Sequence, residues 1–146
     1  MRITYKGDYA LKTILALAKH YGRSPVTIHD LAKRADIPVK FLEQILLDLK
    51  RAGFVQSRRG KIGGYLLARG PAEIKLGEVV RAVDGPIEPI ACLGRKYDGC
   101  RDVNGCVLRN VWVQVAQATS KIIDNLTFED LLKRAKKIDS VLVYQI

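Results

Sequence analysis

The sequence lacks the features of several common classes of protein. No apolar run approaches the roughly 20 residues that a membrane-spanning helix needs, and the first residues, Met1 to Thr4, show no signal-peptide core. No pairing of a nucleophile with a base is visible. The glycine-rich segment 60–64 also lacks the preceding strand and following helix of a phosphate-binding loop. These absences argue against a membrane protein, a secreted protein and an enzyme.

Cysteine is scarce and confined to one segment. The only three cysteines are Cys92, Cys100 and Cys106, with the spacing C-x7-C-x5-C, and the residues between them are rich in glycine and aspartate. Such a polar, glycine-rich stretch predicts a loop over 92–106. An odd number of cysteines without a secretion signal favours the reducing cytoplasm, where thiols bind metal or sense redox state more often than they form disulfides.

Soft thiolates gathered on one loop are the ligands that iron clusters use, so this loop predicts a metal or iron–sulfur site. Three thiols are one short of the usual four ligands, and the fourth must come from elsewhere. The alternative is three unrelated free thiols, or one disulfide with a leftover cysteine.

Positive charge is concentrated in the first half of the chain. The formal net charge of the 146 residues is +10. Residues 1–70 carry 14 Lys and Arg against 5 Asp and Glu, a net charge of +9, whereas residues 71–146 carry 11 against 10, a net charge of +1. Localised positive charge predicts an anionic partner for the first half.

The first half has the pattern of a winged helix-turn-helix. Apolar periodicity predicts helices over about 4–21, 27–35 and 38–52, the second opening on a capping-box pattern, Thr27 to Asp30. Two strand-like segments then flank a basic glycine turn, which predicts a β-hairpin wing. The expected fold class is mainly α with a small β-hairpin: a winged helix-turn-helix over 1–70 plus a long dimerisation helix.

The second half predicts a connector, the cysteine loop and two helices. The connector, 71–91, contains a short helix, and 107–137 forms a long helix and a C-terminal helix. The tail is 138–146, and its segment from Ser140 to Ile146 is apolar without a helical signature and predicts an added strand or disorder. The stripe of the long helix is too apolar for a lone surface helix, so it predicts packing against a second copy, the alternative being that it covers its own domain. The predicted interface is Val107, Leu108, Val111, Val115, Ala118 and Ile122.

The residues expected to contact DNA lie on the third helix and at the wing tip. A recognition helix places its first turns in the major groove. Lys40 donates to guanine or phosphate, Gln44 pairs with adenine, and Glu43 accepts from cytosine or is only a solvated partner of a neighbouring lysine. Arg59 is expected to enter a minor groove, with a solvated turn as the alternative. The full predicted set is Val39, Lys40, Glu43, Gln44, Arg58, Arg59 and Lys61.

These residues resemble a known family, the bacterial winged-helix iron–sulfur regulators of the IscR/NsrR/RirA group. The resemblance covers about residues 1–137. It rests on the segments 9–11, 41–46, 58–68 and 76–85 together with the three cysteines. It implies a cytoplasmic, homodimeric transcription factor that binds double-stranded DNA at a palindromic operator. It further implies that Glu43 and Arg59 match the DNA-reading residues of the family.

The resemblance also implies an iron–sulfur cluster on Cys92, Cys100 and Cys106 whose state changes the affinity for DNA. In one branch a histidine follows the last cysteine by three residues; here that position is Arg109, which cannot ligate iron. In another branch an aspartate early in the first helix ligates the cluster of the partner subunit, and Asp8 matches it. Asp8 is equally explained as a first-turn residue that stabilises the helix dipole. A 4Fe-4S cluster is favoured over 2Fe-2S.

Two other functions compete with this hypothesis. One keeps the DNA-binding module and makes the loop a cluster-free thiol sensor or a zinc site. The other is an iron–sulfur carrier protein or an enzyme with an incidental basic face, which would have no need of the helix-turn-helix and the wing.

Overall fold

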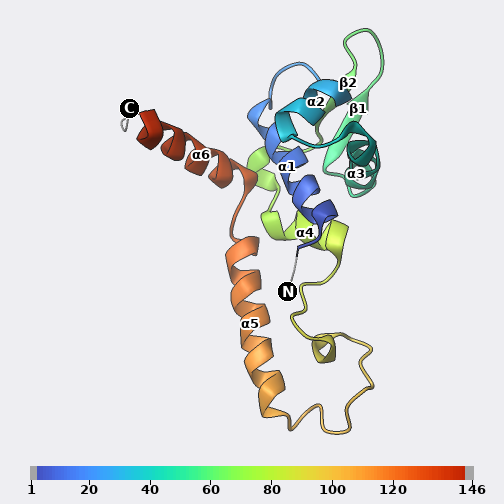
Figure 1. Ribbon diagram of the computed structural model, residues 1–146, viewed down its shortest axis with the longest axis vertical. Helices are drawn as coiled ribbons and strands as arrows, with labels where there is room; N and C mark the ends of the chain where they lie inside the picture. The colour runs from blue at the N-terminus through green and yellow to red at the C-terminus, as the bar shows by residue number, and fades with distance from the viewer. Residues whose placement is uncertain (1–2, 144–146) are drawn as a thin grey trace.

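The fold combines a small helical domain bearing a wing with two helices that project from it (Figure 1). The computed structural model describes residues 3–143. The predicted fold class, mainly α with one hairpin, is confirmed. The elements in order are α1 (Tyr5–Lys19), α2 (Ile28–Ala35), α3 (Val39–Arg51), β1 (Val55–Arg58), β2 (Gly64–Leu67), η1 (Pro71–Glu73), α4 (Leu76–Asp84), η2 (Ala91–Leu93), α5 (Val107–Asp124) and α6 (Phe128–Val143).

The helix-turn-helix begins and ends where local signals place it. The hydroxyl of Thr27 accepts from the amide of Asp30 at 3.2 Å, which caps α2. Asp36 then takes the left-handed conformation, with φ 54°, and allows a tight turn into α3. Pro38 is the N-cap of α3 rather than its first helical residue. Helix α1 ends at Lys19, two residues earlier than the sequence predicts, because His20 already leaves helical geometry.

The wing is an antiparallel hairpin attached to the connector before α2. Strand β1 pairs with β2 from Val55 opposite Leu67 to Arg58 opposite Gly64. Val26 continues the sheet by exchanging two backbone hydrogen bonds with Tyr65, at 2.9 and 2.8 Å. A Cβ on Gly64 would lie 2.4 Å from the carbonyl oxygen of Val26, so this close approach requires glycine. The root of the wing is therefore fixed, and its tip projects freely.

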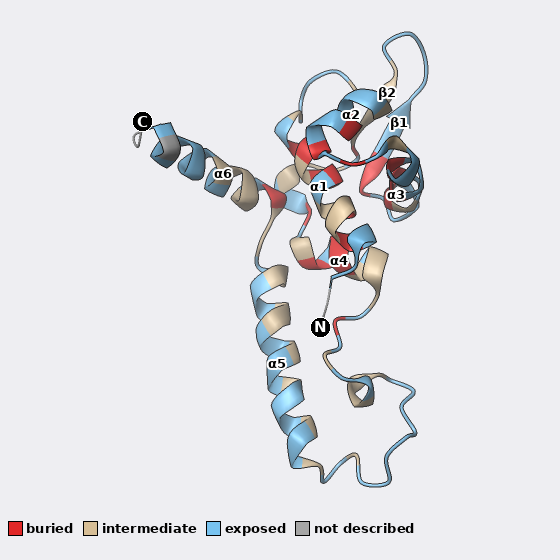
Figure 2. Cartoon of the chain, in the orientation of Figure 1, coloured by how far each residue is buried: buried red, intermediate tan, exposed pale blue. Residues whose placement is uncertain are grey.

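One hydrophobic core serves the winged domain and the start of α6 (Figure 2). Helices α1, α2 and α3 bury their apolar faces in it, and Phe128, the first residue of α6, is fully buried there as well. The amide of Leu76 donates to Leu126 at 2.9 Å, and the amide of Phe128 donates to Ile74 at 3.0 Å. These contacts fix the junction between α5 and α6 to the segment that leads into α4.

Helix α5 is exposed along its length. It runs away from the winged domain, and none of its residues is buried (Figures 1 and 2). All six residues of the predicted interface are exposed in the single chain, Val107 and Leu108 most of all. None of the helices in the described part of the chain is long and apolar enough to cross a membrane.

Helix α6 is longer than the sequence analysis predicts. The expectation of a strand or disorder from Ser140 is wrong over 140–143, because the helix continues to Val143. Leu131, Ala135, Ile138 and Val141 keep a spacing of four and three residues, and no glycine or proline interrupts them. Once a helix is nucleated, each further residue adds a hydrogen bond at little cost, so the β-branched end continues it. Residues 144–146 of the predicted tail lie outside the described part of the chain.

Candidate nucleic-acid interface and cysteine loop

The first turns of α3 present polar side chains to solvent. Leu42, Ile45, Leu46 and Leu49 are buried, which leaves the opposite face of the helix free. On that face Lys40, Glu43 and Gln44 are exposed, whereas Val39 is half-buried. Within residues 3–143 Glu43 makes no ion pair, and the ammonium of Lys50 donates instead to Ser57 at 2.7 Å. The ion pair with a neighbouring lysine, which the alternative role of Glu43 requires, is therefore not formed among residues 3–143.

The wing tip adds a positive surface to this polar face. Arg58, Arg59 and Lys61 are all exposed. Gly60, with φ 114°, accepts a hydrogen bond from the amide of Gly63 at 3.0 Å and closes the turn. The exposed face of α3 and the wing tip together give the charge pattern and shape of a nucleic-acid interface.

The cysteine loop, residues 92–106, runs from η2 to the residue before α5. All three thiols are free; Cys92 and Cys106 are half-buried and Cys100 is exposed. Cys106 is the N-cap residue of α5. Arg109 stands three residues after the last cysteine, where one branch of the resembling family has a histidine ligand. Its Nε donates to the backbone oxygen of Cys92 at 3.3 Å. This contact holds the start of the loop against α5.

The thiols suit an iron–sulfur cluster by their chemistry, because thiolate is the ligand such clusters take from proteins. In the single chain the three thiols do not converge on one point: within residues 3–143, no three His, Cys, Asp or Glu side chains lie close enough to hold a metal ion. The loop would have to close around the group. Asp8 belongs to no such group among residues 3–143, and its carboxylate forms an ion pair and hydrogen bond with the ammonium of Lys12 at 2.7 Å. That hydrogen bond raises the pKa of Lys12.

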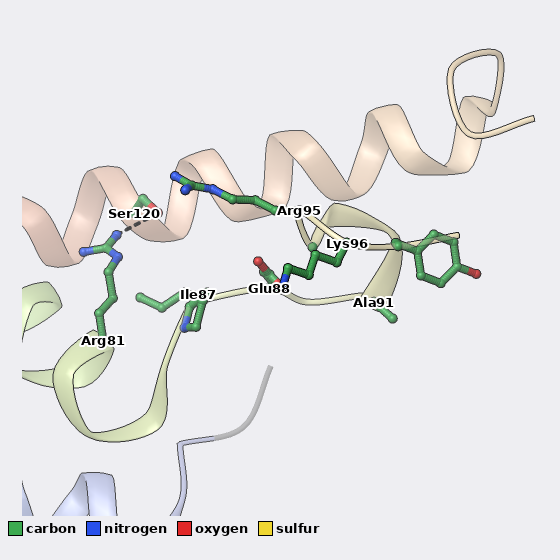
Figure 3. Close-up of a pocket in the computed structure, with 10 residues that line it drawn as sticks. Arg81, Ile87, Glu88, Ala91, Arg95, Lys96 and Ser120 are labelled. Carbon is green, nitrogen blue, oxygen red and sulfur yellow. Dashed lines mark hydrogen bonds between the residues drawn. The ribbon is translucent and has the colours of Figure 1, made fainter. Parts of the chain in front are cut away.

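A cavity of 820 Å³ lies between the start of this loop and α5 (Figure 3). Arg81 enters it from α4, Arg95 and Lys96 from the loop, and Ser120 from α5. At residues 94–97 of the loop, the cavity separates the chain from Ser120 of α5.

A polar clamp fixes α5 to α4. The guanidinium of Arg81 donates to both carboxylate oxygens of Asp124, at 2.6 and 3.0 Å, and to the hydroxyl of Ser120 at 3.2 Å. Gly77 allows the approach, since a Cβ there would lie 2.0 Å from Asp124 Oδ1. The hydrogen bonds from Arg81 lower the pKa of Asp124 and raise that of Arg81.

Acid is expected to weaken this clamp. The folded pKa of Asp124 lies below its unfolded value of about 3.9, so the clamp stabilises the fold above that pH and stops doing so as the pH falls through the folded pKa. Asp124→Asn is expected to lower the thermal unfolding midpoint at pH 7, and the difference from wild type should narrow below about pH 4. Asp139→Asn, on the exposed face of α6, is the control. A difference that stays constant between pH 7 and pH 3 would contradict the assignment.

Sequence reasoning missed the polar contacts between distant segments. The clamp joins residues 43 apart, and the bond from the Thr4 hydroxyl to Asp84 joins residues 80 apart. No local pattern signals such pairs. A third contact, from Gln44 Nε2 to Asp48 Oδ1 at 3.1 Å, has helical i,i+4 spacing and was readable from the sequence.

Comparison with known proteins identifies relatives along nearly the whole chain. Residues 3–134 match the sequence model of the Rrf2 family, described as an iron-dependent transcriptional regulator. The rrf2-like HTH-type transcriptional regulator of Rhodobacter capsulatus is 45% identical over 137 residues, which cover 89% of this chain and 91% of that protein.

Two solved structures share the fold. CymR, the global cysteine regulator of B. subtilis, superposes with a TM-score of 0.77 at 30% identity, covering 92% of this chain and 98% of that one. IscR of T. potens superposes with a TM-score of 0.75 at 31% identity, covering 94% and 90%.

Proposed function

Because the chain belongs to the Rrf2 family of transcriptional regulators, we propose that it is a homodimer whose affinity for a DNA operator is set by an iron–sulfur cluster. The family consists of DNA-binding regulators and not enzymes. The observation that carries the proposal is the placement of all three cysteines on one accessible loop that leads directly into the exposed α5. The proposed cluster ligands and the proposed dimer interface therefore lie next to each other in the chain. Such a regulator would act in the bacterial cytoplasm.

The exposed stripe of α5 supports the dimer. A helix with no buried residue and an apolar stripe is stabilised when a second copy covers that stripe. The predicted contact residues therefore remain Val107, Leu108, Val111, Val115, Ala118 and Ile122. Two copies related by a twofold axis would present two α3 helices to the half-sites of a palindromic operator, about one DNA turn apart.

Cys92, Cys100 and Cys106 would hold the cluster, with Asp8 of the other subunit as the proposed fourth ligand. The ion pair of Asp8 with Lys12 is half-exposed on both sides, so little free energy opposes its exchange for iron. A carboxylate is a hard ligand for iron, which suits a cluster that reacts or dissociates. When bound, the cluster would supply an iron centre responsive to iron supply, nitric oxide or redox state, and 4Fe-4S is favoured over 2Fe-2S.

The residues of the chain would convert cluster binding into a change of geometry. Closing the loop would fix Cys92 and Cys106 relative to each other at the start of α5. A shift of α5 would then move α4, because the hydrogen bonds between Arg81 and Asp124 join the two helices. The separation of the two α3 helices in the dimer would follow. A ligand shifts such an equilibrium only through its different affinities for the two arrangements.

The test is to purify the full chain without oxygen and measure visible absorption, iron and sulfide, then operator affinity with and without the cluster. We expect a charge-transfer band, iron and sulfide in equal amounts, and two different affinities. Equal affinities of the two forms would rule out cluster control.

A cluster-free thiol sensor or zinc site is the second candidate. It is favoured by the exposed Cys100 and the separated thiols of the single chain, and by the likeness to a cysteine regulator. Anaerobic protein with no visible band and no sulfide, but with zinc or with an affinity for DNA that depends on thiol oxidation, would support this candidate over the cluster.

The wing should contribute to affinity whatever the loop binds. Arg59→Ala is expected to weaken DNA binding and to reduce the slope of log affinity against log salt by about one charge, because one cation no longer displaces counterions. A filter-binding or anisotropy titration across salt concentrations measures this slope. Lys137→Ala, an exposed cation on α6, serves as the control and should leave the slope unchanged.

A further inference from the structure

One of the predicted base-reading residues is held by a second side chain on its own helix. Gln44 donates from Nε2 to Asp48 Oδ1 at 3.1 Å. The other carboxylate oxygen of Asp48, Oδ2, lies 2.6 Å from the ammonium of Lys6, which belongs to the first turn of α1. Three side chains from two helices thus form one chain of contacts that ends at Gln44.

Chemistry fixes which end of the Gln44 amide faces Asp48. An ionised carboxylate only accepts hydrogen bonds, so the NH₂ group must face it. The carbonyl oxygen and the second N–H of Gln44 then remain available, and those are the acceptor and donor that pair with the N6 and N7 edge of adenine. The contact therefore leaves the Gln44 carbonyl oxygen and its second N–H free to pair with a base, while it fixes the orientation of the amide group.

Asp48 is kept ionised by its surroundings. Its side chain is 22% exposed. Oδ2 is buried and makes no well-aligned hydrogen bond among the described residues, so the charge of Lys6 is what compensates it. The contacts with Lys6, aided by Gln44 and Arg51, lower the pKa of Asp48. Loss of Lys6 would leave a half-buried carboxylate whose only remaining cation among residues 3–143 is Arg51, at 4.0 Å.

Lys6 is itself placed by the attachment of α1. The amide and hydroxyl of Thr4 donate to the carboxylate of Asp84 at 2.9 and 2.5 Å, and Gly7 packs so closely on that carboxylate that a Cβ would lie 2.3 Å from it. Lys6 and Gln44 also line the same 480 Å³ groove between α1 and α3. The first turn of α1 is thus a fixed platform beside the recognition helix.

We propose that Lys6 and Asp48 are positioning residues that orient Gln44 for base readout, so that the first turn of α1 takes part in operator specificity. This inference rests on the proposed function, because it needs α3 to read DNA. It assigns a role to two residues outside the predicted DNA contacts, neither of which has to touch a base.

The experiment compares base preference in the full chain, purified without oxygen and with matched cluster content. Selection from a randomised duplex pool defines the site of the wild type. Competition binding with each base pair substituted then gives the preference at every position. Gln44→Ala is expected to lose roughly 10-fold or more of the preference at one base pair of each half-site, the range expected for loss of a bidentate contact.

Asp48→Ala, which removes both acceptor oxygens, and Lys6→Met should reduce preference at that same base pair and at no other. Asp48→Ala on the Gln44→Ala background should add nothing, since both changes act through one side chain. Lys133→Met also removes an exposed ion-paired lysine but lies on α6, and it should leave every position unchanged. Thermal unfolding of each variant separates altered readout from loss of fold.

The double variant Lys6→Glu with Asp48→Lys exchanges the two charges. It distinguishes an effect on the orientation of Gln44 from an effect on the packing of α1 against α3. It retains an ion pair but gives Gln44 no acceptor, so the unfolding midpoint should recover while the base preference does not. Recovered preference, or preference in Asp48→Ala equal to wild type at the position sensitive to Gln44, would overturn the proposal. A wild type that selects no site at moderate salt would instead overturn the proposed function.

Discussion

Replacement of Phe128 by alanine is expected to lower the free energy of unfolding by about 3–5 kcal/mol, the range for a fully buried phenylalanine. Phe128 has no exposed surface and packs in the core of the winged domain although it begins α6. The cavity left behind cannot collapse easily, because hydrogen bonds between the segments around Ile74 and Phe128 fix the backbone on both sides. Urea unfolding of the purified protein measures the change.

Phe41→Ala is the matched control for this prediction. It removes the same side chain from a position that is 58% exposed, where the ring lies with its centroid 6.3 Å from that of Tyr9. Its cost should be about 1 kcal/mol or less. If the two variants were equally stable, the anchoring of α6 in the winged core would be refuted.

Removal of one cysteine is expected to have the largest effect on function. Cys100→Ala should lose most of the iron and sulfide that the wild type takes up without oxygen, because one chain offers only three thiols and a cluster needs four ligands. The affinity of this variant for the operator should then be the same with and without iron supply. Iron and sulfide analysis, together with visible absorption, measures the first effect, and an operator titration measures the second.

Asn104→Ala tests whether the loss is specific to the thiol. It changes an exposed residue of the same loop without removing a thiol, and the variant should retain its iron and its switch. A Cys100→Ala variant with full cluster content would eliminate Cys100 as a ligand. It would not bear on the DNA contacts proposed for α3 and the wing, which depend on other residues.

The elements that the sequence predicts well are those with local causes. Thr27 caps α2 through a neighbour three residues away, and the wing turns at glycines between two short strands. Contacts of this kind depend on a few adjacent residues, so the pattern alone identifies them. The exposed stripe of α5 and the exposed residues at the start of α3 follow from the 3.6-residue period in the same way.

The remaining features depend on contacts between distant segments. Asp124 and Asp84 read as ordinary surface acids, yet one joins α5 to α4 and the other holds α1. Gly77 reads as a weak point in a helix, but its missing side chain makes room for Asp124. The cysteine spacing predicts a loop and a class of ligand, whereas the positions of the thiols depend on a conformation that no spacing encodes. The end of α6 is predicted wrongly because its last apolar residues, taken by themselves, show no helical signature, whereas the helix nucleated before them continues through them.

The pair of backbone hydrogen bonds between residues 74–76 and 126–128 has a consequence for local stability. The amides of Leu76 and Phe128 lie in the core unit, so their hydrogen exchange should require opening of the whole winged domain. The amides at the far end of α5 have no buried side chains around them and should exchange through local fraying in a single chain. Protection spreading from residue 124 toward residue 107 with rising protein concentration would therefore report assembly directly, residue by residue along one helix.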